Sequence, residues 1–282
     1  MDVEIFIEQE EKVGTNNSTK EEVKKDGGGA FEEMLEDEMD SLNEKEIWCW
    51  ERTRIDKALE VVRDAERQDP AEVHAAARGL VPIIVSANVE QFIFKIESLA
   101  NRIDPSAIFN SLSKAGGGSL LHVAVATCKD DILRLLLDYV PGHLIAAQND
   151  RGDTPLHMAI LVGRITATAM LIRRIMDLPN VEDKKRILRM QNKDGNTALQ
   201  EAVHASNVNC VRHLSNEDLE PVYWKTTDQT SPLYLAFQSI HEVFLSLPLE
   251  PSRIQVSPPI HGAILILRLG KYLNLFIVSI YV

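Results

Sequence analysis

The sequence predicts an all-α solenoid of four to five irregular helix-turn-helix units behind an acidic N-terminal tail. A six-residue pattern, with a large aliphatic side chain at its third place and alanine at its sixth, recurs five times. Successive copies start 35, 43, 34 and 27 residues apart, which is typical of stacked repeats. The copies begin at Ser119, Thr154, Thr197, Ser231 and Pro258.

The residue types in this pattern indicate a turn followed by a short helix. Serine or threonine at the first place caps a helix by accepting a hydrogen bond from an otherwise unpaired backbone N–H. Proline at the second place suits the first helical turn. Glycine stands two places before the cap at Gly117, Gly152 and Gly195, where a tight turn requires a positive φ.

A second helix is predicted after the first two copies. Ile132 to Leu137 supplies its apolar face in one unit, and Ile165 to Ile172 does so in the next. A single pair of helices cannot bury these faces alone, so the units must stack. The intervals of 43 and 27 residues indicate an insertion and a damaged last unit.

Charge separates the N-terminus from the rest of the chain. Residues 1–50 hold 16 acidic and 5 basic side chains, whereas the other 232 residues hold 26 and 25. We expect residues 1–43 to be a disordered acidic tail and residues 44–68 to form an amphipathic helix that packs on the following units. The nearly neutral body argues against nucleic acid as a partner.

These units resemble ankyrin repeats, and more narrowly the plant accelerated-cell-death-type proteins, which end in a Pro-Gly-Gly membrane domain. The resemblance covers residues 69–263, and it is carried by SLLHVAVATCKDDILRLLLDYVPGHLIAAQN from Ser119, GDTPLHMAI from Gly152, GNTALQEAV from Gly195 and SPLYLA from Ser231. The expected units lie near residues 69–110, 117–150, 152–193, 195–228 and 229–255, with a remnant from 256.

The chain departs from that family in two places. Leu80 to Ala87 (LVPIIVSA) is not needed by the repeat pattern, and we expect it to be an insertion in the first unit. Residues 264–282 form an apolar tail in which Arg268 and Lys271 oppose a membrane span. We expect the family's further repeats and its C-terminal membrane domain to be absent.

No motif indicates an enzyme, a cofactor or a metal site. His122, His157 and His261 share one repeat position, where ankyrin histidines hold the turn by hydrogen bonding. One histidine per unit does not converge on a metal as ligands must. Gly116-Gly117-Gly118 lacks the lysine and hydroxyl of a phosphate loop.

The resemblance implies a protein-binding adaptor in plant defence or stress signalling, in the cytoplasm or at the cytoplasmic face of the plasma membrane. A membrane-associated signalling protein and a regulatory subunit of an enzyme are the alternatives. Loops on a rigid scaffold commonly carry contacts, so the candidate binding residues are those predicted at exposed turn tips. They are Asp150, Arg151, Asp153, Lys193, Asp194, Asn196, Asp228 and Gln229.

Overall fold

The structure is a computed structural model, and it describes residues 42–60, 69–86, 88–111, 118–225, 230–238 and Leu247. Within these ranges the elements are helices, and Gln191 and Thr197 form an isolated antiparallel bridge. The helices are α2 (Leu42–Glu60), α3 (Pro70–Ser86), α4 (Val89–Ala100), α5 (Pro105–Asn110), α6 (Leu120–Ala126), α7 (Asp130–Tyr139), α8 (Gly142–Ile145), α9 (Pro155–Leu161), α10 (Ile165–Met176), α11 (Val181–Leu188), α12 (Ala198–His204), α13 (Val208–Glu217), the 3-10 helix η2 (Glu220–Tyr223) and α14 (Pro232–Gln238).

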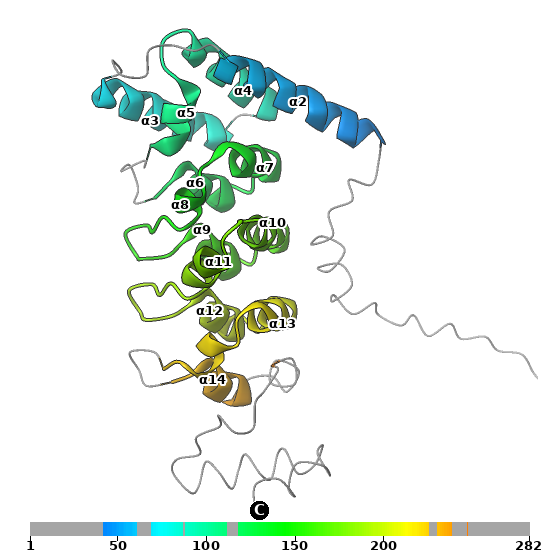
Figure 1. The fold of residues 1–282 in the computed structure, drawn as a ribbon, viewed down its shortest axis with the longest axis vertical. Helices are drawn as coiled ribbons and strands as arrows, with labels where there is room; N and C mark the ends of the chain where they lie inside the picture. The colour runs from blue at the N-terminus through cyan, green and yellow to red at the C-terminus, as the bar shows by residue number, and fades with distance from the viewer. Residues whose placement is uncertain are drawn as a thin grey trace, which may run out of the picture.

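The helices stack in two columns. Figure 1 shows α6, α9, α12 and α14 in one column and α7, α10 and α13 beside it. The first helix of each unit packs against its own second helix and against the first helix of the next unit. The prediction of an all-α solenoid is therefore confirmed.

The repeated pattern lies in the core between the units. Its third-place residues Leu121, Leu156 and Leu199 are buried, and so are the sixth-place alanines of the same units. A larger side chain at the alanine positions would hold neighbouring first helices apart, since protein cores are close-packed. The repeat in the sequence is thus a repeat of the contacts that join units.

Each first helix ends on a residue with a positive φ. The residue after the helix C-cap is Cys128 (φ 60°), Gly163 (φ 73°) or Ser206 (φ 54°). In each unit the next N–H reaches back to the sixth-place alanine carbonyl; Arg164 N donates to Ala159 O over 2.8 Å. This bond closes the helix end and turns the chain into the second helix.

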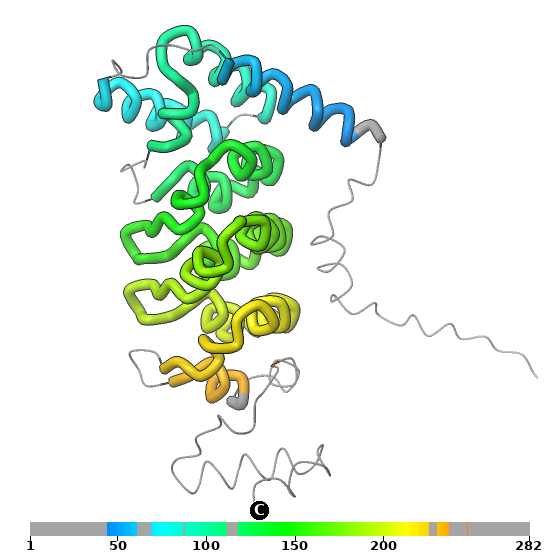
Figure 2. The backbone as a smooth tube through the Cα atoms, in the orientation of Figure 1, coloured from blue at the N-terminus to red at the C-terminus, as the bar shows by residue number. Residues whose placement is uncertain are grey.

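Two projecting loops precede α9 and α12, and we name residues 149–153 the first finger and residues 192–196 the second finger. Figure 2 shows both leaving the stack on the same side. Gly152 has φ 78°, and a Cβ added there would lie 2.8 Å from the backbone N of Lys193. Glycine is therefore required at this position both for the turn and for the close approach of the second finger.

The segment predicted to be an insertion, Leu80 to Ala87, is helical over residues 80–86. It forms the second half of α3, which continues past Pro82 and at 17 residues is longer than the seven-residue first helices α6 and α9. The buried side chains Val73, Ala77, Leu80 and Ile84 recur at helical spacing and supply the reason. Their burial outweighs the hydrogen bond that Pro82 removes from the helix.

The amphipathic helix predicted over 44–68 is α2, which spans Leu42–Glu60; residues 61–68 lie outside the described residues. Its apolar side chains divide between two environments. Ile55 and Ala58 are buried on the array as expected, whereas Ile47 and Trp50 are about half exposed. Residues 1–41 and the apolar tail at 264–282 also lie outside the described residues.

The long interval between the second and third copies of the pattern contains an extra helix. α11 spans Val181–Leu188 and follows α10 before the second finger begins. Ile187 and Leu188 are buried and attach α11 to the stack, whereas Val181 is exposed. The insertion therefore lengthens the second unit without separating it from the third.

We predict that Cys128→Gly and Ser206→Gly each stabilise the array by about 0.5–1 kcal/mol. A positive φ destabilises a residue that has a side chain by about 1–2 kcal/mol, and glycine removes this strain. Glycine also gives the unfolded chain more backbone entropy, which offsets part of the gain in stability. The reverse change, Gly163→Ala, is destabilising even though no atom lies within 4 Å of its added Cβ. Urea denaturation followed by circular dichroism measures the stability of all three variants. A loss of stability in both glycine variants would contradict the positive φ of Cys128 and Ser206.

Candidate functional site

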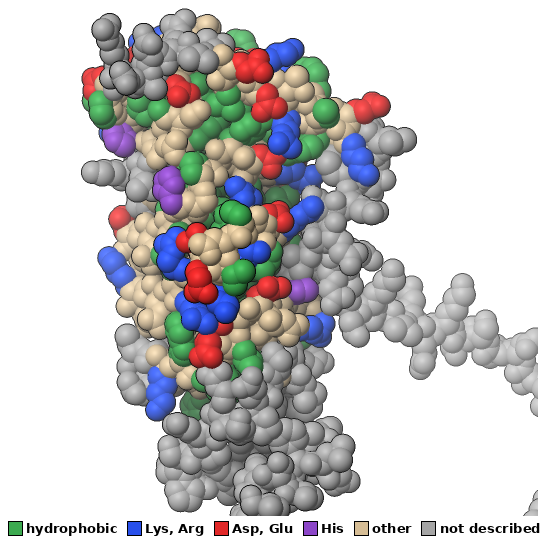
Figure 3. Space-filling view, viewed as in Figure 1, with side chains coloured by type: hydrophobic (Ala, Val, Ile, Leu, Met, Phe, Trp, Pro, Cys, Tyr) green, Lys and Arg blue, Asp and Glu red, His purple; other side chains and the backbone are tan. Residues whose placement is uncertain are grey.

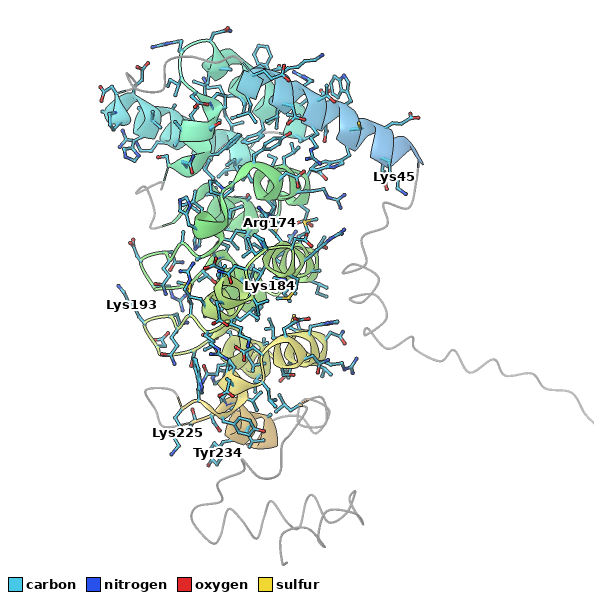
Figure 4. All side chains as sticks on the ribbon, viewed as in Figure 1. Lys45, Arg174, Lys184, Lys193, Lys225 and Tyr234 are labelled. Atoms are coloured by element: carbon cyan, nitrogen blue, oxygen red, sulfur yellow. The ribbon has the colours of Figure 1, made fainter. Side chains whose placement is uncertain are left out.

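The candidate residues at the finger tips are exposed. Asp150 and Arg151 lie on the first finger, and Lys193 and Asp194 lie on the second. Figure 4 shows Lys193 at the outer edge of the stack. The two fingers therefore present four charged side chains of both signs to one side of the molecule.

Two of the remaining four candidates, Asp153 and Asn196, do not lie at exposed tips. Asp153 is only 2% exposed, and its Oδ1 accepts a hydrogen bond from Asn192 Nδ2 at 2.9 Å. Asn196 is half-buried and donates to Glu201 Oε1 at 2.9 Å. The prediction that Asp153 is an exposed contact is wrong, because that carboxylate joins the two fingers internally. Asp228 and Gln229 lie outside the described residues.

Asparagine side chains fix the shape of both fingers. Asn149 Oδ1 accepts from the backbone N–H groups of Arg151 (2.8 Å) and Asp153 (2.9 Å). Asn192 Oδ1 accepts in the same way from Asp194 (3.1 Å) and Asn196 (3.0 Å). A backbone bond from Lys193 N to Arg151 O (2.9 Å) ties the second finger to the first. The tips are thus held on a rigid base.

Sequence reasoning missed an exposed apolar surface on α9. Leu161 and Val162 are 42% and 52% exposed, and Met158 is half-buried on the same side. These residues stand at i, i+3 and i+4 and so form one stripe, which we name the α9 strip. The opposite side of the helix carries the buried core residues Leu156, Ala159 and Ile160. The sequence did contain a signal for this surface, because the apolar residues Ile160 to Val162 directly follow the sixth-place alanine.

The equivalent positions in neighbouring units are smaller or polar. Ala126 and Thr127 end α6 in the preceding unit, and His204 and Ala205 end α12 in the next unit. Since α9 packs between α6 and α12, smaller or polar side chains flank its apolar strip on both sides. In Figure 3 acidic and basic side chains are interspersed over the visible face. Such a mixed surface favours apolar contact over steering by a strong field of one sign.

A hydrogen-bond ladder joins the units beneath this surface. In α6 and α9 the histidine Nδ1 accepts from the backbone N–H of its own cap, from Ser119 at 3.0 Å and from Thr154 at 3.3 Å. The ring proton therefore sits on Nε2. From there His122 donates to Asp153 O (2.9 Å) and His157 donates to Asn196 O (3.0 Å). Each histidine thus holds the finger of the next unit, as the sequence predicted.

Glutamine fills the same role in the next unit. Gln200 Oε1 accepts from Thr197 N (2.6 Å), and Gln200 Nε2 donates to Trp224 O (3.2 Å). The position thus requires one acceptor and one donor in a neutral side chain. Burial lowers the pKa of both His122 and His157 below the usual histidine value of 6.5, which keeps the rings neutral.

Within the described ranges, no three side chains of the histidine, cysteine, aspartate or glutamate type converge where they could hold a metal ion. Nor does any helix in those ranges combine the length and apolar character that crossing a membrane requires. The surface formed by the exposed finger tips and the α9 strip is the candidate functional site.

Comparison with known proteins identifies the repeat. The family described as "Ankyrin repeats (many copies)" matches residues 121–172, from α6 to α10. The match assigns the segment from α6 to α10 to ankyrin repeats. It includes the predicted stretches Leu121 to Asn149 and Gly152 to Ile160, with both histidines of the ladder, whereas the stretches from Gly195 and from Ser231 lie beyond it.

Two curated relatives share part of this region. The nuclear factor NF-kappa-B p105 subunit of Gallus gallus is 32% identical over 121 residues, which is 43% of this chain. The NF-kappa-B p100 subunit of Xenopus laevis is 37% identical over 70 residues, which is 21% of this chain. The chain spans only 11% and 7% of the length of these relatives.

Among solved structures, the ankyrin repeat domain of Bcl-3, a member of the IkappaB protein family, is 16% identical. The match covers 64% of this chain and 98% of that domain, with a TM-score of 0.26.

We predict that replacing both ladder histidines by glutamine makes stability less sensitive to acid. Unfolded histidine takes up a proton below about pH 6.5, whereas the native rings stay neutral until their lowered pKa is reached. The natural chain therefore loses stability as the pH falls below 6.5, by at most about 1.4 kcal/mol per pH unit for each histidine. His122→Gln with His157→Gln removes that loss.

The measurement is the urea midpoint between pH 7.5 and 5.0. His204→Gln is the matched control, since His204 is exposed at the end of α12 and outside the ladder. An unchanged pH dependence in the double variant, with folding intact, would show that the ladder does not depend on neutral rings.

Proposed function

We propose that this chain binds a protein partner through the finger tips and the α9 strip, and that it acts without enzymatic chemistry of its own. The observation that carries the proposal is the exposure of Leu161 and Val162 on a helix whose other side is fully packed. Exposed apolar residues gathered at one place mark interaction sites when polar residues surround them. Here Thr127 at the end of α6 and His204 at the end of α12 supply polar residues on either side of the strip.

The site is built for recognition with little rearrangement. The ladder and the asparagine bonds hold both fingers to their helices. A partner therefore meets a surface that is already ordered, which reduces the entropy lost on binding. The apolar centre supplies affinity, and the charged tips supply orientation and specificity.

The finer setting rests on the sequence resemblance alone. We propose an adaptor in plant defence or stress signalling, in the cytoplasm and at times at the cytoplasmic face of the plasma membrane. The ankyrin repeats are compatible equally with a membrane-associated relative of the Pro-Gly-Gly type and with a regulatory subunit of an enzyme. Co-purification of an enzyme or fractionation with membranes distinguishes these settings.

Leu161→Ser together with Val162→Ser should abolish partner capture while leaving the fold intact. Exposed positions usually change stability by less than about 0.5 kcal/mol, whereas loss of the apolar centre removes the main source of affinity. The control is Val181→Ser, because Val181 is 57% exposed but lies on α11. Affinity capture from native tissue with mass spectrometry compares the three chains.

Proteins retained by the natural chain and by Val181→Ser, but lost from the double variant, are the expected partners. If the double variant retained the same set of proteins, the binding surface would have to lie elsewhere.

A separate prediction concerns the tips. Replacing Arg151, Lys193 and Asp194 by alanine should weaken capture without moving the thermal midpoint, because their side chains are exposed on a rigid base. Asp153→Ala should instead lower the midpoint, since it breaks the bond to Asn192 within the base. Equal effects of the two changes on stability would contradict the division between tip and base.

A further inference from the structure

The outward side of α2 is a second surface with the character of an interface. α2 packs on α4 through buried Ile55 and Ala58 and through an ion pair between Arg54 and Glu97. Its N-terminal part projects beyond the stack in Figure 1, and Figure 4 labels Lys45 there. Trp50 lies near the middle of α2 and is 51% exposed. It has no role in the surface formed by the finger tips and the α9 strip.

Trp50 is held in a fixed orientation. The guanidinium carbon of Arg54 lies 4.8 Å from the centre of its ring, and Arg54 Nε donates to Glu97 Oε1 at 2.7 Å. One side of the indole is therefore covered by a cation that α4 anchors, while about half of the residue stays open to solvent. Rigid aromatic side chains of this kind are common anchors of interfaces.

The outward stripe of α2 is complementary to itself. Glu46, Trp50, Thr53 and Lys57 follow at intervals of four, three and four residues, which places them on one side of a helix. All four are exposed. Glu46 lies four residues before Trp50, and Lys57 lies four residues after Thr53. A two-fold axis between Trp50 and Thr53 would therefore bring Glu46 of one helix opposite Lys57 of an antiparallel copy.

We propose that two copies of this chain associate through an antiparallel pair of α2 helices centred between Trp50 and Thr53. Each Trp50 then packs against Thr53 of the other copy, and two reciprocal ion pairs join Glu46 to Lys57. Such an isologous contact closes on itself and limits the assembly to a dimer. The ankyrin surface on the fingers and α9 stays free in both copies.

Charge also selects the antiparallel arrangement. Residues 1–41 hold 14 acidic and 4 basic side chains and join each α2 at its N-terminus. An antiparallel pair places these two acidic segments at opposite ends, whereas a parallel pair would place them together. Antiparallel helix dipoles also attract each other. The four-residue stripe buries less area than the ~800 Å² that each partner buries in a standard interface. The dimer is therefore weak and depends on concentration.

The test is a charge exchange followed by sedimentation velocity of the full chain over a range of concentrations. Glu46→Lys and Lys57→Glu should each lower the association constant about tenfold or more, because a like-charge contact replaces an attractive one. The double variant E46K/K57E should restore association, because the reciprocal pairs form again with reversed sign. Trp50→Ala should abolish association in any charge background.

The matched control is Lys45→Glu, which changes the net charge as Lys57→Glu does but lies on α2 outside the stripe. It should leave association unchanged. Association through the apolar residues 264–282 would survive all of these variants and would overturn the proposal. So would a chain that is monomeric at every concentration, or a double variant as weak as either single one, with circular dichroism confirming that each variant is folded.

Discussion

In α6, α9 and α12 the side chain at the fourth place of the repeated pattern determines how the helix fits the chain that follows it. It accepts a hydrogen bond from the cap of its own helix and donates one to a backbone carbonyl further along the chain. Neutral histidine does this in α6 and α9, and glutamine does it in α12. Because both atoms belong to one rigid or short side chain, the distance between a helix and the following finger is fixed. The spacing of units, the burial of the alanines and the position of the finger tips all depend on this bond.

This constraint also decides which residues are left for binding. The buried side of every first helix is occupied by the core and the ladder, so variation is tolerated only at the finger tips and at the exposed end of the helix. The units differ at these exposed positions. α9 carries Leu161 and Val162, whereas its neighbours carry alanine, threonine or histidine at the same places. An apolar centre on a scaffold of nearly equivalent units distinguishes one unit from the others and gives the surface a preferred point of contact.

The sequence predicted the parts of the fold that arise from local chemistry. Capping residues, turn glycines and small alanines each act over a few residues, so their pattern identified α6, α9 and α12 and the role of the histidines. It was less informative where long-range burial competes with local preference. The segment from Leu80 to Ile84 contains proline and β-branched residues, yet it is helical because Leu80 and Ile84 fill the core beneath it. Asp153 looked like a tip residue because the sequence does not show that Asn192, 39 residues later, binds its carboxylate.

The ladder has a direction, since each donor lies on a first helix and its acceptor lies later in the chain, in the following unit for both histidines. An acceptor carbonyl keeps a second lone pair and is readily hydrated, but a buried donor without its acceptor costs more. During synthesis on the ribosome, each first helix emerges before the finger that satisfies it. The growing end of the nascent array therefore always carries one unsatisfied donor, which the next unit removes. The same asymmetry makes the C-terminal boundary of such an array, rather than its N-terminal boundary, the place where unravelling begins.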